Sequence, residues 1–167
     1  MKLTSAMANK LLKDYQRQIE ELEQMEMETM KFTVASTEDV ESVRPEYDYG
    51  AIRLAISDLN RKIVKLKHYI NQFNITTVIQ GFEMTVDKAL VWLPMLNREA
   101  QRLGMMANMH AKTRCSSRLT APLIEYQYAN YDIDKAKTDY ENVLATIREL
   151  QLALDTVNNT IEFEIEL

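Results

Sequence analysis

The stretch from residue 131 to residue 167 changes its hydrophobic period once, and that change constrains the fold more than any other feature. Along its first part, apolar side chains recur at alternating steps of three and four residues. They are Ile133, Ala136, Tyr140, Val143, Ile147, Leu150, Leu154 and Val157. This spacing predicts a long helix with one stripe turned toward a partner helix. Asp132 is placed to cap the start of that helix.

Beyond Asn158-Asn159, which we expect to stop the helix, the period becomes two. Apolar residues at 161, 163, 165 and 167 alternate with glutamates at 162, 164 and 166. Strict alternation is typical of a half-buried strand. The chain therefore predicts a final strand over 160–167 whose outer edge needs a partner.

A similar pattern lies 84 residues earlier. Tyr47-Asp48 matches Tyr131-Asp132, and Asn74 and Thr76 match Asn158 and Thr160. The matching seam is Tyr49, Ile52, Ile56, Leu59, Ile63, Leu66, Ile70 and Phe73. A shift of 84 is twelve heptads, so two bundle helices that obey the same packing rules would also align. An internal duplication with halves 1–80 and 85–167 and two unrelated helices both stay open.

The remaining segments complete a mainly α fold with a minor β part. Seams predict further helices over 3–27 and from Thr85 onward, the latter with Pro94 inside it. Short strands are expected at 30–34, where Lys31 would face the glutamates of the last strand, at 75–80 and at 124–128. Residues 36–46 and 110–122 are interpreted as loops. The sum is an α+β fold: a four-helix antiparallel bundle with two long helices and a small antiparallel sheet, in one domain of residues 1–167.

Composition limits which partners the protein can bind and which cell compartment it occupies. The formal charge of −5 argues against nucleic acid as a partner, since duplex binders carry a basic face. A single cysteine, Cys115, fits a reducing compartment. The first residues lack the apolar run of a signal peptide, and no segment approaches a membrane span. We therefore expect a cytoplasmic protein with no membrane partner.

Several strings are similar to a family of small bacterial helical proteins labelled "septicolysin". They are 71–77 (NQFNITT), 81–85 (GFEMT), 112–114 (KTR), 125–132 (EYQYANYD) and 150–158 (LQLALDTVN). The resemblance spans nearly the whole chain and implies a helical fold, but it brings no catalytic residues or ligand. The label implies a cytolysin. The lack of an export signal and of an aromatic-rich inserting loop favours a different function.

Few residues suggest chemistry. Three glycines cannot build a phosphate loop, and His68, His110 and Cys115 lack the spacing of a metal site. His110 and Cys115 share one loop, but nothing nearby supplies an orienting carboxylate for a catalytic pair. Met105, Met106 and Met109 could form a soft-metal cluster, although methionines at helical spacing more often fill a core. We expect no enzyme activity, no cofactor and no metal.

One group of residues stands out as a candidate interaction or anion site: Lys112, Arg114, Arg118, Tyr126, Tyr128 and Tyr131. The tyrosines could pack under a helix or line a contact surface. The basic loop 112–118 could meet the acidic connector 38–46, either within a subunit or between subunits.

The leading hypothesis is a non-enzymatic intracellular interaction or assembly protein that forms a homo-oligomer, a dimer or higher, with an unidentified protein partner. The alternative is a small-molecule (anion) binding protein or enzyme that uses the Lys112–Arg118 loop.

Overall fold

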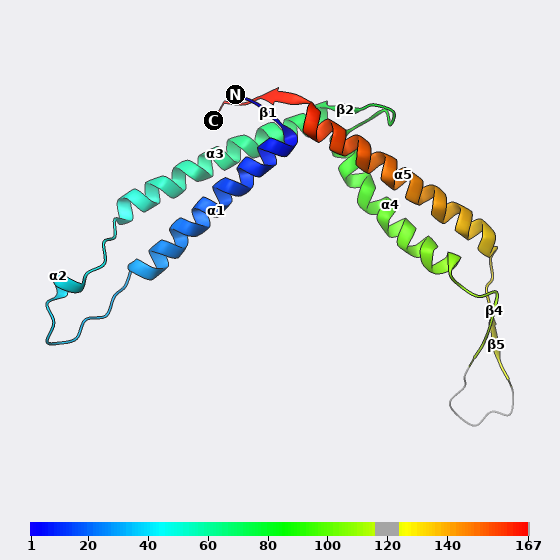
Figure 1. Cartoon of the computed structure of the whole chain (residues 1–167), viewed down its shortest axis with the longest axis horizontal. Helices are drawn as coiled ribbons and strands as arrows, with labels where there is room; N and C mark the ends of the chain where they lie inside the picture. Colours follow the sequence, from blue (N-terminus) through cyan, green and yellow to red (C-terminus); the bar gives the residue numbers. More distant parts are fainter. Residues whose placement is uncertain (116–123, 167) are drawn as a thin grey trace. The chain divides into compact units, whose positions relative to one another are not determined.

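The computed structural model describes residues 1–115 and 124–166, and this part of the chain is mainly helical (Figure 1). The helices are α1 (Ser5–Thr29), α2 (Val40–Val43), α3 (Tyr49–Thr76), α4 (Val86–Ala107) and α5 (Ile133–Thr160). The strands are β1 (Lys2–Thr4), β2 (Val78–Ile79), β3 (Met84–Thr85), β4 (Lys112–Arg114), β5 (Tyr126–Tyr128) and β6 (Glu162–Glu164). The prediction of a mainly α fold with a minor antiparallel β part is confirmed.

The strands form three separate two-stranded antiparallel sheets, β1–β6, β2–β3 and β4–β5. The chain divides into two compact units. Unit 1 is Met1–Thr76 together with Val157–Leu167, and unit 2 is Thr77–Thr156. The four long helices thus make two helical hairpins, one in each unit.

In unit 1, α1 and α3 lie side by side and antiparallel (Figure 1). The Thr4 side chain caps α1 by accepting from the Met7 backbone N–H. The core of this unit contains Ala8 of α1, Leu66 and Ile70 of α3, and Ile165 from the end of the chain. Residues more than 90 positions apart in the sequence therefore share one apolar cluster.

The last strand pairs with the first residues of the chain, which corrects two expectations. Residues 2–4 are strand β1 rather than the first turn of a helix, and Leu3 lies opposite Phe163 of β6. The Met1 nitrogen donates to the Ile165 carbonyl oxygen at 2.7 Å. Residues 31–35 form no strand, and the cation beside the final glutamates is Lys2, 3.9 Å from Glu164, rather than Lys31. Alternating apolar residues at 30–34 do not by themselves make a strand, because a strand also needs a neighbouring strand to pair with.

In unit 2, α4 and α5 lie side by side (Figure 1). The Thr85 side chain caps α4, and Pro94 lies inside that helix, both as predicted. Gly104 of α4 approaches Tyr140 of α5 closely, because a Cβ atom at Gly104 would lie 3.2 Å from the Tyr140 ring. Because glycine has no Cβ atom, the Tyr140 ring can pack closely against α4 at this position.

The expected helix stop at Asn158-Asn159 is wrong, because α5 continues to Thr160. Likewise α3 passes Asn74 and ends at Thr76, whose hydroxyl donates to the Gln72 carbonyl oxygen. Asparagine inside a helix costs less than about 1 kcal/mol relative to alanine. Burial of neighbouring residues such as Phe73 and Val157 readily offsets a penalty of that size.

Both segments interpreted as loops contain regular structure. The connector 36–46 includes the short helix α2, capped by Asp39, which accepts from the Ser42 N–H. The segment 110–122 includes strand β4, and its residues 116–122 lie outside the described part of the chain.

The two longest helices correspond closely. Both α3 and α5 have 28 residues, begin 84 positions apart, and are followed by a short strand. Asp48 accepts from the Ala51 N–H and Asp132 accepts from the Lys135 N–H, so equivalent carboxylates cap the two helices. Heptad packing alone does not require equal caps and equal lengths. The two compact units do not coincide with halves 1–80 and 85–167, so the duplication stays a prediction.

The packing of Ile165 predicts how unit 1 responds to truncation of this side chain. Ile165 is 1% exposed, so Ile165→Ala should lower the free energy of unfolding by about 2–4 kcal/mol through lost burial and a residual cavity. Ile161 lies on the same segment but is 40% exposed, so Ile161→Ala serves as the control. Chemical denaturation of both variants measures the difference, and equal losses would contradict the role of Ile165.

Candidate functional site

The β4–β5 hairpin of unit 2 brings together four of the six predicted site residues. Antiparallel pairing sets Lys112 opposite Tyr128 and Arg114 opposite Tyr126. Residues directly opposite each other in an antiparallel pair share a face, and alternate residues on one strand also share it. Lys112, Arg114, Tyr126 and Tyr128 therefore occupy one face of the hairpin. Arg118 lies outside the described residues.

On this face the cation contacts both rings. The Lys112 Nζ lies 4.0 Å from the centroid of the Tyr126 ring and 5.3 Å from that of Tyr128. An ammonium over an exposed aromatic face contributes roughly 0.5–1 kcal/mol. Both tyrosines are exposed, so the idea that they pack under a helix is wrong. The arrangement is an open surface of two cations and two aromatic rings.

Tyr131 is separate from that face and has a structural role. It is half-buried, and its hydroxyl donates to the Met106 carbonyl oxygen near the C-terminal end of α4 at 2.8 Å. The bond joins the start of α5 to the end of α4. Tyr131 is thus a packing residue rather than part of a binding surface.

Tyr47 has the equivalent position in unit 1 and was not among the predicted site residues. Its hydroxyl donates to the Glu26 carboxylate at 2.7 Å, near the end of α1. The sequence signal that could have found it is the repeated Tyr-Asp pair before each long helix. The pKa of Tyr47 is raised to about 12, mainly by the hydrogen bond to Glu26 and secondly by desolvation of the phenol.

The other candidate groups form no chemical centre. Met105 and Met109 are exposed and Met106 is half-buried, so the expectation that these methionines fill a core is wrong. His68 and His110 are exposed. Within residues 1–115 and 124–166 there is no group of three or more His, Cys, Asp or Glu side chains placed to hold a metal ion.

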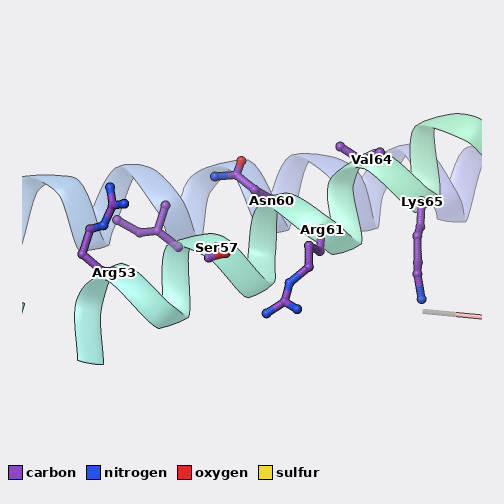
Figure 2. Close-up of a pocket in the computed structure, with 7 residues that line it drawn as sticks. Arg53, Ser57, Asn60, Arg61, Val64 and Lys65 are labelled. Atoms are coloured by element: carbon purple, nitrogen blue, oxygen red, sulfur yellow. The ribbon is translucent and has the colours of Figure 1, made fainter. Parts of the chain in front are cut away.

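A first hollow, of about 560 Å³, runs along α3 and is drawn in Figure 2. All of its lining residues come from this one helix, and Figure 2 shows Arg53 and Asn60 leaving one edge while Arg61 and Lys65 leave the other. Arg61 is paired with Asp58 on the same helix. A hollow lined by a single helix is open helix surface and not an enclosed substrate pocket.

A second hollow, of about 690 Å³, lies where β1 meets α1. Its apolar lining comes from Met1, Leu3, Met7, Leu11 and Tyr15. Lys10, Lys13, Asp14 and Arg17 complete the lining. An apolar floor with a charged margin resembles the centre and rim of a protein interface.

Comparisons with known proteins support the fold. No protein-family model matches the sequence, and no curated protein matches it. A solved structure, the crystal structure of a functionally unknown conserved protein from Corynebacterium diphtheriae, is similar with a TM-score of 0.64 and 19% sequence identity. The match covers 98% of this chain and 100% of that one. At this identity the likeness shows a shared fold.

None of the helices in the described ranges has the length and apolar character of a bilayer-spanning segment.

The Tyr47–Glu26 bond predicts a pH dependence of stability. Because the folded-state pKa is raised above its ordinary value near 10, the bond's contribution is present below about pH 10 and is lost as pH rises toward about 12. The stability difference between wild type and Tyr47→Phe should therefore shrink over this range. Denaturation at several alkaline pH values measures it, with tyrosinate absorbance as a second readout. Tyr49→Phe, on an exposed neighbour, should leave the effect in place.

Proposed function

We propose that this protein is a non-enzymatic, cytoplasmic assembly protein that acts as a homo-oligomer. The observation that carries the proposal is the surface that the chain leaves exposed. Its solvent-accessible area is 12661 Å². A single globular protein of 167 residues exposes about 8500 Å².

Dividing a compact chain into two separate units accounts for only part of this excess. Two separate globular proteins of half this size would together expose about 10300 Å², still about 2400 Å² less than this chain. The physical reason lies in the hairpins, because two helices can bury only the stripes that they turn toward each other. Exposed area of this size is what subunits cover when they assemble, since standard interfaces remove about 800 Å² from each partner.

Exposed apolar side chains on the outer faces of the long helices also support assembly. Leu54 and Val64 of α3, Val91 and Met105 of α4, and Leu152 of α5 are all exposed. Single exposed apolar residues are ordinary, but α3 and α4 each carry several, and larger exposed apolar patches are typical of protein interaction surfaces. With a net charge of −5, the proposed partner is another protein surface rather than nucleic acid or a membrane. The single cysteine supports the cytoplasmic placement.

The β4–β5 hairpin supports a second candidate, the binding of a small anion. Lys112 and Arg114 share a face with two tyrosines and have no acidic neighbour directly across the hairpin. Against it, all four side chains are exposed, so water competes for any bound anion and the contact would be weak. Assembly is therefore the function that the geometry supports best.

Sedimentation velocity on the purified protein tests the proposal. At micromolar concentration in moderate salt, we expect a dimer or a larger closed oligomer. Assembly covers the open helix faces and so removes their apolar area from water, which is favourable. A monomer under these conditions would contradict it. Stabilisation of that monomer by several degrees with one anionic metabolite, lost in Lys112→Ala, would favour the anion-binding alternative.

A further inference from the structure

Besides the seam that packs against α3, α1 carries a second row of side chains at heptad spacing. This α1 side row consists of Met7, Leu11, Asp14, Gln18, Leu22 and Met25. Met7 is 54% exposed and Met25 is 51% exposed, while Leu11 and Leu22 are half-buried. Steps of three and four keep the row on one side of the helix. The row is apolar toward both ends and polar at its centre, where Gln18 donates to Asp14, and within unit 1 only α3 lies along α1.

A row at the same spacing, charged at its centre, lies on α3. This α3 side row consists of Ala51, Ala55, Asp58, Lys62, Lys65 and Tyr69. A contact between the helices shows that both rows border the same side of the hairpin. The Lys62 Nζ lies 5.7 Å from the centroid of the Tyr15 ring, and Tyr15 lines the apolar hollow with Met7 and Leu11.

Each row is self-complementary about its central point. About a point near Gln16, Met7 mirrors Met25 and Leu11 mirrors Leu22. About a point near residue 60 of α3, Asp58 mirrors Lys62, and small Ala51 mirrors large Tyr69. The two centres lie at the same level of the hairpin, because Tyr15 is beside Lys62. A two-fold axis through that level would therefore satisfy both rows at once.

Charge along α1 selects the direction of pairing. The first half of the helix carries Lys10, Lys13 and Arg17, whereas residues 20–28 carry five glutamates and no cation. A parallel arrangement of two α1 helices would place glutamates against glutamates. An antiparallel arrangement places the basic half of each helix beside the acidic half of the other, with Lys10 near Glu21 of the partner subunit.

We propose that the α1–α3 hairpin packs face to face and antiparallel against the same hairpin of a second copy, forming a four-helix bundle across a two-fold axis. In this bundle Met7 meets Met25 of the partner subunit, Leu11 meets the partner's Leu22, and Asp58, which is paired with Arg61 on its own helix, also faces the partner's Lys62. The face is about 37 Å long and roughly 20 Å wide. That is close to the roughly 800 Å² per partner of a standard interface. The inference rests on the proposed homo-oligomer and names the surface that holds it together.

Charge substitutions at the exposed ends of the α1 side row test the surface. Met7→Glu with Met25→Glu should raise the dimer dissociation constant at least about a hundredfold, since each substitution places an unpaired carboxylate in an apolar contact. Met27→Glu is the matched control, because Met27 is 66% exposed on the same helix but outside the row. Sedimentation measures the dissociation constants, and circular dichroism checks that the helices remain folded. A dimer that tolerates the double substitution as well as the control would overturn this interface while leaving the proposed function standing.

Cysteine trapping tests the direction, in a Cys115→Ser background. Protein carrying Met7→Cys, mixed with protein carrying Met25→Cys, should form a mixed disulfide-linked dimer under mild oxidation. Met25→Cys alone should not link to itself, because antiparallel pairing separates the two sites by about 27 Å along the bundle. Efficient self-linking at this position would mean parallel pairing and would overturn the inference. A wild-type monomer would remove the proposed function and the inference together.

Discussion

The structure depends on a limit of geometry, namely that a pair of helices buries only the stripe each turns toward the other. The hairpin of α1 and α3 encloses Ala8, Leu66 and Ile70, but residues beside the seam such as Leu11 and Leu22 stay half-buried. A bundle of three or four helices would cover these flanks. Unit 1 instead adds a strand from the far end of the chain, and the remaining flank of the hairpin is only half-buried.

Strand pairing decides which parts of the chain meet. Strand β6 pairs with β1, and β2 pairs with β3, so each two-stranded sheet sits where a helix begins and another has ended. In unit 1 this places Ile165 in the apolar cluster and Lys2 beside Glu164. A short sheet of two strands is marginal by itself. Here the helices on which it packs supply the burial that keeps it formed.

Repetition of one helix design explains much of the remaining order. Both 28-residue helices start after a Tyr-Asp pair whose aspartate caps the helix. Both tyrosine hydroxyls reach the end of the preceding long helix, Tyr47 at Glu26 of α1 and Tyr131 at Met106 of α4. The six-residue candidate site, by contrast, divides: four members share the face of the β4–β5 hairpin, Tyr131 belongs to helix packing, and Arg118 lies outside the described chain.

What the sequence determined by itself was periodic and local. The three-and-four spacing of α3 and α5, the Thr85 cap, Pro94 inside α4 and the alternation that makes β6 all follow from neighbours within a few residues. Only the tertiary structure decided that β6 pairs with residues 2–4 rather than 30–34, that the helices run past Asn74 and Asn158, and that Lys112 lies over two tyrosine rings. Alternation specifies a strand but not its neighbour, and a weak helix breaker yields whenever distant side chains bury the turn that contains it.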